Sequence, residues 1–172
     1  MKKQIIVRAD GNSKIGIGHI ARCIYFLENI KKKHEAVFCF TENSLIKEFL
    51  ISRKYSSHEI DPKLSLDQEI DKLLDFSSGF VILDVRNKPN EYHKSYSENF
   101  DNVLRFDDSS EPINLYANQY LNYNLYAKDV KFNLKNNKCK LYLGPKYYIL
   151  NPSFKKYVDF KRLFEKKGSK SY

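Results

Sequence analysis

Apolar residues occur along the chain in two alternating patterns: short continuous runs, typical of buried strands, and positions repeated at helical spacing. The runs predict strands at residues 3–7, 36–41, 57–60, 79–83, 103–106, 120–121 and 140–143. The repeated positions predict helices around residues 20–30, 45–50 and 66–74. Strands that alternate with helices favour an α/β fold with a parallel sheet covered by helices.

Length and composition indicate one folded domain. A chain of 172 residues suits a single core, since chains split into several domains only beyond about 250–300 residues. Its 42% hydrophobic and 30% charged residues are ordinary for globular proteins. We predict a domain over residues 1–152, followed by a basic helix or tail over residues 153–172.

The cysteines and the apolar stretches narrow the class of protein further. Cys23, Cys39 and Cys139 are far apart and show no metal-binding spacing, so we expect free buried thiols, no disulfide framework and no zinc site. No apolar stretch approaches the ~20 residues that cross a bilayer, and the first residues do not resemble a signal peptide. We therefore expect a cytoplasmic protein.

The net charge of +9 predicts an anionic partner. Lysines occur in separate clusters at residues 31–33, 135–140 and 155–170, without an arginine-rich block or an RNA-binding pattern of basic and aromatic residues. We therefore expect no nucleic acid. The charge of the basic tail suits docking to an acidic protein or weak attachment to a membrane surface. Of these two, we do not expect the contact with a membrane.

Polar residues that end the predicted strands are the first candidates for a site, because parallel sheets bind ligands outside the carboxyl ends of their strands. Asp10, Asp84, Asp107 and Asp108 follow three of these strands. Such carboxylates orient sugar hydroxyls, hold a catalytic base or bind a metal, but they also commonly cap the next helix. The sequence leaves these roles open.

The loop after the first strand is the most informative segment. Half of the chain's six glycines lie there, and Gly16 and Gly18 predict backbone that turns tightly or approaches a ligand closely. His19 begins the following helix, where the helix dipole favours a neutral imidazole that accepts a proton. The alternative is a structural histidine that only hydrogen-bonds its neighbours. The other three histidines are predicted to lie on the surface, namely His34, His58 and His93.

The same loop gives only weak support to a nicotinamide cofactor. Gly16, Gly18 and Ala21 depart from the Gly-x-Gly-x-x-Gly pattern of dinucleotide-binding folds, although alanine sometimes takes the third place. Glu42, after the second strand, is a weak candidate for the ribose contact. We therefore expect no cofactor.

This loop also resembles a known family. Residues 8–10, Arg-Ala-Asp, and residues 15–23, Ile-Gly-Ile-Gly-His-Ile-Ala-Arg-Cys, are similar to the opening of the UDP-2,4-diacetamido-2,4,6-trideoxy-altropyranose hydrolases of pseudaminic acid biosynthesis, which the related spore-coat polysaccharide proteins share. The family signature Gly-x-Gly-His-x-x-Arg is matched at residues 16–22. Further pieces agree in the same order, at residues 81–84, 106–108, 121–127 and 143–154.

The resemblance implies a fold and a reaction. Family members have two Rossmann-like domains in the type-B glycosyltransferase (GT-B) arrangement, and this chain would be equivalent to the N-terminal half. They hydrolyse the bond between the anomeric carbon and UDP by direct attack of water, with inversion and without a metal. His19 would be the base that activates the water, Gly16 and Gly18 would let the backbone approach the substrate, and Arg22 would support the loop or contact an anion. The substrate-binding set would be Asp10, Gly16, Gly18, Arg22, Asp84, Asp107 and Asp108.

Two departures limit the resemblance. Asn151 stands where the family usually has an arginine, and the chain ends near the start of the family's second domain, which supplies much of the grip on uracil and diphosphate. We therefore predict a hydrolase-type domain for a UDP-linked amino-deoxy sugar that needs a C-terminal-domain partner or self-association. The alternatives are a non-catalytic binding or scaffold subunit of a split glycosyltransferase-like complex, and a degenerate domain without activity.

Overall fold

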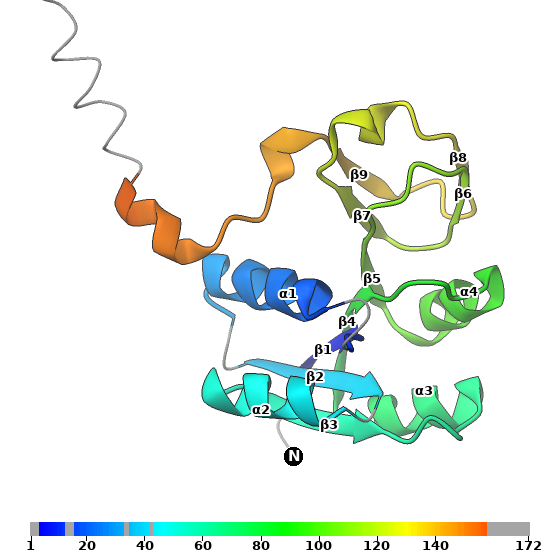
Figure 1. Ribbon diagram of the computed structural model, residues 1–172. Coiled ribbons are helices and arrows are strands. Elements are labelled where there is room, and N and C mark those ends of the chain that lie inside the picture. The colour runs from blue at the N-terminus through cyan, green and yellow to red at the C-terminus, as the bar shows by residue number, and fades with distance from the viewer. Residues whose placement is uncertain (1–3, 13–15, 33–34, 42, 158–172) are drawn as a thin grey trace, which may run out of the picture.

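The computed structural model describes residues 4–12, 16–32, 35–41 and 43–157, which form an α/β fold (Figure 1). The strands and α-helices are β1 (Gln4–Ala9), α1 (Gly18–Asn29), β2 (Ala36–Thr41), α2 (Ser44–Ser52), β3 (Ser56–Ile60), α3 (Leu66–Leu74), β4 (Ser77–Asp84), α4 (Asn90–Asn99), β5 (Asn102–Phe106), β6 (Ile113–Leu115), β7 (Gln119–Asn122), β8 (Phe132–Leu134) and β9 (Lys140–Leu143). Three short 3-10 helices follow the later strands, η2 (Leu125–Lys128), η3 (Pro145–Tyr147) and η4 (Pro152–Tyr157).

The main sheet has seven parallel strands in the order β3-β2-β1-β4-β5-β7-β9. The chain starts in the middle of the sheet, winds outward to β3, and then returns to add β4 on the other side of β1. Val7 of β1 lies opposite Phe38 of β2 and Ile82 of β4. The predicted Rossmann-like parallel sheet is confirmed, whereas its equivalence to half of a GT-B fold stays a prediction.

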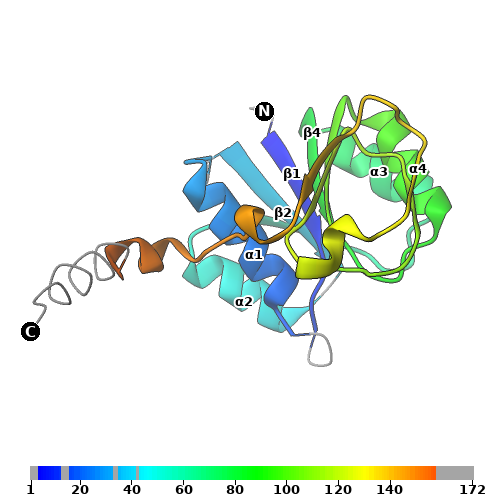
Figure 2. The ribbon, with the colours of Figure 1, turned by 90° about the horizontal axis from the view of Figure 1, so that it is seen from above.

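Helices cover both faces of the sheet, as predicted. α1 and α2 pack on one face and α3 and α4 on the other (Figures 1 and 2). Successive strand residues point to opposite faces, so Val7 joins the core under Ile20 of α1 while Ile6 joins the core under Tyr96 of α4. All four side chains are fully buried. These two cores fix the positions at which β1 and β4 end.

A two-stranded parallel sheet, β6 with β8, covers the far part of the main sheet on the α4 side. Phe132 of β8 meets Tyr120 of β7 edge to face, with ring centroids 5.3 Å apart. Ile113 of β6 is buried in the same core and lines the pocket described below. This small sheet therefore forms one wall of the site.

The apolar pattern misses α4, β6 and β8. The buried side chains of α4 are Tyr92, His93 and Tyr96, so no aliphatic stripe marks the helix. β6 and β8 have three residues each, which is too short to produce a pattern. Four predicted strands also begin earlier than expected, at Ser56, Ser77, Asn102 and Gln119.

A buried ion network ties β1 to α3 and α4. Arg8 Nε donates a hydrogen bond to Glu69 Oε1 at 2.8 Å, and the hydroxyls of Tyr92 and Tyr96 donate to the same oxygen at 2.6 Å. Arg8 also donates to Asp10 Oδ1 at 2.6 Å. Burial alone would raise the pKa of Glu69 and of Asp10, but the charge of Arg8 and these hydrogen bonds lower both pKa values below their usual range. The network holds the start of the loop after β1.

The segment after β9 returns toward α1. The Asn29 side-chain amide donates to the Leu150 carbonyl at 2.9 Å. Asn151 Oδ1 accepts from the Ser153 backbone N–H at 3.0 Å, so Asn151 starts the turn into η4. The predicted tail begins inside η4, its residues 158–172 lie outside the described residues, and the boundary at residue 152 stays a prediction.

Candidate functional site

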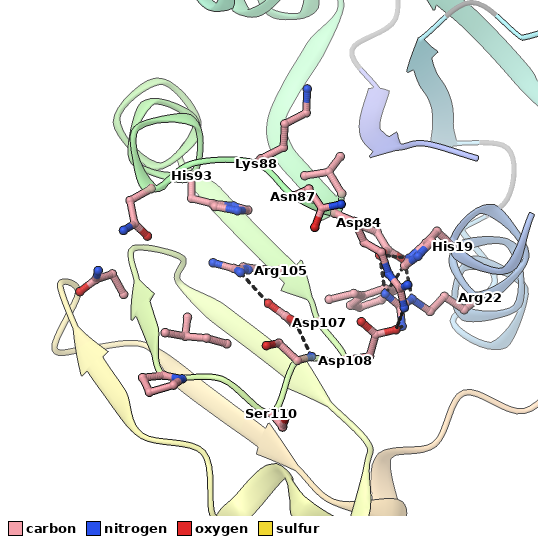
Figure 3. Close-up of a pocket in the computed structure, with 18 residues that line it drawn as sticks. His19, Arg22, Asp84, Asn87, Lys88, His93, Arg105, Asp107, Asp108 and Ser110 are labelled. Atoms are coloured by element: carbon pink, nitrogen blue, oxygen red, sulfur yellow. Dashed lines mark hydrogen bonds and ion pairs between the residues drawn. The ribbon is translucent and has the colours of Figure 1, made fainter. Parts of the chain in front are cut away.

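A polar pocket of about 500 Å³ lies at the carboxyl ends of β4 and β5, beside the N-terminus of α1 (Figure 3). The chain reverses its winding between β1 and β4, and open α/β sheets bind ligands at such switch points. Five of the predicted site residues line the pocket, namely His19, Arg22, Asp84, Asp107 and Asp108. The structure therefore brings together residues that lie up to 89 positions apart in the sequence, from His19 to Asp108.

Asp84, the last residue of β4, is the centre of the site and is only 1% exposed. Its Oδ1 lies 2.7 Å from His19 Nδ1. Arg22 donates from Nε to Oδ2 and from Nη2 to Oδ1, both at 2.5 Å. His19 and Arg22 reach the same carboxylate because they lie about one turn apart on α1.

The Arg22–Asp84 pair is ionised at neutral pH. Burial alone would raise the pKa of Asp84, but the hydrogen bonds from Arg22 and His19 and the charge of Arg22 lower it below its usual range. Burial opposes the charged form of Arg22 as well, yet the contacts with Asp84 raise its pKa above the usual value. The Tyr123 hydroxyl accepts a further hydrogen bond from Arg22 Nη1 at 3.3 Å. Arg22 thus holds Asp84, while the two roles predicted for it, support of the loop after β1 and contact with an anionic ligand, stay predictions.

The contact with Asp84 fixes the tautomer of His19. A carboxylate only accepts hydrogen bonds, so Nδ1 carries the proton and donates it to Oδ1. Arg22 Nη2 also lies 2.9 Å from Nδ1, but two donors do not hydrogen-bond each other. In the neutral ring Nε2 then carries the lone pair, and no group in the described parts of the chain hydrogen-bonds it. This is the arrangement of a carboxylate-oriented general base.

Asp107 and Asp108 follow β5 and are both ion-paired. Arg105 donates to Asp107 Oδ2 at 2.5 Å, and the Ser109 backbone N–H donates to Asp107 Oδ1 at 2.8 Å. Arg86 donates to Asp108 Oδ2 at 2.5 Å. The Asp107 side chain is 11% exposed and that of Asp108 is 31% exposed, so Asp108 is the more accessible to a ligand.

The alternative of helix capping is wrong for all three carboxylates after β4 and β5. α4 begins at Asn90 with Pro89 at its N-cap, several residues beyond Asp84. Asp107 and Asp108 precede a strand, β6, instead of a helix.

The remaining three predicted residues do not line this pocket. Asp10 lies in an adjacent hollow that also reaches His19, and its Oδ1 accepts from the Thr41 backbone N–H at 2.9 Å. Gly16 has a φ of +70° and its N–H donates to the Asn12 carbonyl at 2.8 Å, which confirms the predicted tight turn. Gly18 starts α1 without a positive φ, so the tight turn is wrong there, and a close approach of its backbone to a ligand stays a prediction.

The two glycines provide a matched pair for a stability test. We expect Gly16→Ala to lower the free energy of unfolding by about 1–2 kcal/mol, because an L-residue is strained at positive φ. Gly18→Ala should change it by less than about 0.5 kcal/mol. An added Cβ meets nothing within 4 Å at either position, so backbone conformation alone distinguishes them. Urea unfolding measures both values, and equal losses would contradict the assignment.

Sequence reasoning missed four basic side chains in the pocket, which come from the loop after β4, from α4 and from β5. They are Arg86, Lys88, His93 and Arg105. The prediction of a surface position is wrong for His93, which is 6% exposed because α4 packs this side against the sheet. Aromatic residues at positions 92, 96 and 100 repeat at helical spacing and were the available signal.

The sequence also predicted the positions of residues outside the pocket, among them the other histidines and the cysteines. His58 is exposed on β3, as predicted, whereas His34 and Glu42 lie outside the described residues. The three cysteines are free; Cys23 and Cys39 are buried, but Cys139 is only half-buried.

Comparison of the sequence with models of known protein families and with curated proteins finds no match, so the geometry of the site carries the functional argument. Among the described residues, no three His, Cys, Asp or Glu side chains converge as metal ligands do. Within the same residues, no helix is both long and apolar enough to cross a membrane.

Proposed function

We propose that this chain is a nucleotide-sugar hydrolase-type domain in which His19 activates water for attack on the anomeric carbon of a UDP-linked amino-deoxy sugar. The observation that carries the proposal is the 2.7 Å contact between His19 Nδ1 and the buried Asp84, which leaves Nε2 as a proton acceptor beside a polar pocket. The resemblance of the loop and strand ends to the UDP-sugar hydrolases named above supports the choice of substrate.

The proposed reaction needs only water, the substrate and the side chains of the site. His19 Nε2 takes one proton from water as the water oxygen forms a bond to the anomeric carbon. The bond from that carbon to the phosphate oxygen breaks, and UDP leaves with the electron pair. Asp84 stabilises the imidazolium that forms, and Arg22 acts as a positioning residue because it holds both Asp84 oxygens.

Isotope labelling tests the proposal. Hydrolysis of the UDP-linked 2,4-diacetamido sugar in H₂¹⁸O should place ¹⁸O in the free sugar and none in UDP, since water attacks carbon and not phosphorus. Mass spectrometry of both products measures this. Label in UDP would show attack on phosphorus, and absence of turnover with the chain and any purified partner would end the hydrolase proposal.

A non-catalytic scaffold is the second candidate, because large apolar side chains are exposed near the ends of β7 and β9. Two adjacent hollows that share Tyr148 are lined by several of them. We call this set the apolar rim: Ile30, Leu125, Tyr126, Tyr148, Leu150 and Phe154. Leu125 is 84% exposed. Contiguous exposed apolar surface commonly marks a protein interface.

We expect the apolar rim to mediate association, with itself or with a partner domain. Sedimentation velocity of the purified chain at tens of micromolar should show dimers or larger species. Leu150→Asp combined with Phe154→Asp should restore the monomer, because a buried unpaired carboxylate opposes an apolar interface. Ile51→Asp, at a 61% exposed apolar residue of α2, is the matched control and should leave association unchanged. A monomer in every case, with no partner bound, would remove the scaffold candidate.

A further inference from the structure

One side of the pocket collects positive charge. Arg86, Lys88 and Arg105 line it together with the start of α4. Arg86 and Arg105 are each paired with an aspartate, at 2.5 Å. Lys88 differs from them, because among the described residues no carboxylate lies within ion-pair distance of its ammonium group; its Nζ lies 4.7 Å from the centre of the Tyr92 ring. Lys88 therefore keeps a charge available for a ligand.

His93 has a buried ring nitrogen without a hydrogen-bond partner among the described residues. The side chain is only 6% exposed, and no described group hydrogen-bonds its Nδ1. Figure 3 shows the ring pointing from α4 into the pocket, near Arg105 and on the opposite side from His19. Leaving such a group unsatisfied is costly, so its position calls for a ligand that completes it.

The field at His93 is positive. Burial, and after it the charges of Arg105 and Lys88, lower the pKa of His93 to about 3, so the ring is neutral at pH 7. A neutral imidazole still offers one N–H donor. Asp107 already pairs with Arg105, so an anion beside the ring would chiefly offset the charge of Lys88.

The N-terminus of α4 adds backbone donors on the same side. α4 spans Asn90–Asn99, ten residues, and Pro89 at the N-cap makes no side-chain hydrogen bond to the first turn. Asn90 lines the pocket. Helix N-termini with unpaired N–H groups favour phosphate and carboxylate groups.

We propose that Lys88, His93, Arg105 and the N-terminus of α4 form an oxyanion subsite that binds a phosphate or carboxylate carried by the substrate. The subsite rests on the proposed function only for the identity of that substrate. Because it lies across the pocket from His19, it takes a part of the ligand remote from the attacked carbon. The oxyanion has two possible sources, the diphosphate of the nucleotide or an acidic group on the sugar ring.

Changes in the histidine ring signals of ¹H–¹³C NMR spectra measure binding at the subsite without any turnover. The chain has four histidines, and His93→Gln assigns the signal of His93. The probes are inorganic phosphate, UDP, UDP-glucose and UDP-glucuronate at millimolar concentration, pH 7 and constant ionic strength. We expect the probes that carry an oxyanion to shift the His93 signal. Lys88→Gln should lower the affinity of each such probe about tenfold, roughly the contribution of one charge-assisted hydrogen bond.

Lys94→Gln is the matched control, since Lys94 lies on the same helix, is exposed and pairs with Glu98 at 3.6 Å. It should leave every affinity unchanged. Tighter binding of UDP-glucuronate than of UDP-glucose, lost in Lys88→Gln, assigns the subsite to an acidic sugar. Equal effects of UDP and both UDP-sugars assign it to the diphosphate.

The subsite and the hydrolase proposal fail separately. A His93 signal that responds to phosphate while no UDP-sugar is hydrolysed supports the subsite and leaves the proposed function without support. A His93 signal that stays constant with all four probes, or shifts equally in Lys88→Gln, overturns the subsite even if hydrolysis is observed.

Discussion

His19→Gln is expected to lower hydrolysis of the UDP-sugar by ~10²–10⁴, the usual contribution of general acid–base catalysis, without unfolding the chain. The glutamine amide can still donate to Asp84, so the buried carboxylate keeps a partner in place of the 2.7 Å contact with His19 Nδ1. The variant loses the lone pair at Nε2 that accepts the proton, because an amide is not a base. Initial rates and thermal unfolding, measured on the same samples, separate catalysis from stability.

His58→Gln is the matched control, because His58 is exposed on β3 and lies outside both pockets that His19 lines. Its rate should equal that of the unchanged chain. An unchanged rate in His19→Gln would remove His19 from the mechanism, whereas a variant that unfolds would indicate the purely structural histidine that the sequence left as an alternative.

The sheet was predictable because its central strands are buried on both faces. β1, β2 and β4 are continuous apolar runs that need no partner information to be recognised, and helices at the intervening positions left a parallel sheet as the natural arrangement. β6 and β8 were not predictable in this way, since each has three residues and is defined only by its pairing with the other. Their position depends on tertiary contacts, which a run of three residues does not reveal.

The site was predictable at strand ends and not on α4. Asp84 and Asp107 follow apolar strands, and the topology of parallel sheets places such residues at one edge. The role of Asp84 was left open, because only the folded chain brings it within 2.7 Å of His19. His93 was missed since its burial follows from the packing of an aromatic helix face, which an aliphatic pattern does not reveal.

Asp84→Asn is expected to cost both activity and stability, about 3 kcal/mol of the latter at pH 7, because it leaves the charge of Arg22 buried without its carboxylate. The value is placed at the low end of the range for broken buried pairs, since Asp108 remains 3.7 Å from Arg22. Urea unfolding measures the loss. Asp71→Asn, at an exposed carboxylate of α3, is the control and should change the free energy of unfolding by less than about 0.5 kcal/mol.

A double substitution distinguishes a broken ion pair from general damage to the core. Arg22→Gln alone leaves the Asp84 carboxylate without its cation, whereas Arg22→Gln with Asp84→Asn removes both charges. The double variant should therefore be more stable than the sum of the two single losses predicts, by about 1–3 kcal/mol. Strict additivity would show that the two side chains do not act as a pair.

The pH dependence of stability tests the same pair without changing the size of any side chain. The pKa of Asp84 in the folded chain lies below its usual value, because the contacts of Arg22 and His19 outweigh the effect of burial. As pH falls below about 4–5, Asp84 is therefore protonated in the unfolded chain before it is protonated in the folded chain. The contribution of Asp84 to the free energy of unfolding is complete above that range and is lost below it. Asp10 and Glu69 have lowered pKa values as well, so Asp84→Asn should flatten the acid side of the stability curve without abolishing its slope. Urea unfolding of both chains between pH 3 and pH 7, roughly the range in which carboxylates titrate, measures the difference. Parallel curves over that range would mean that Asp84 has the same pKa in the folded and the unfolded chain, and its stabilising pair with Arg22 would have to be given up. A stability that falls relative to that of Asp84→Asn as pH rises would mean that Asp84 is protonated in the folded chain, and the orientation of His19 by a carboxylate would have to be given up.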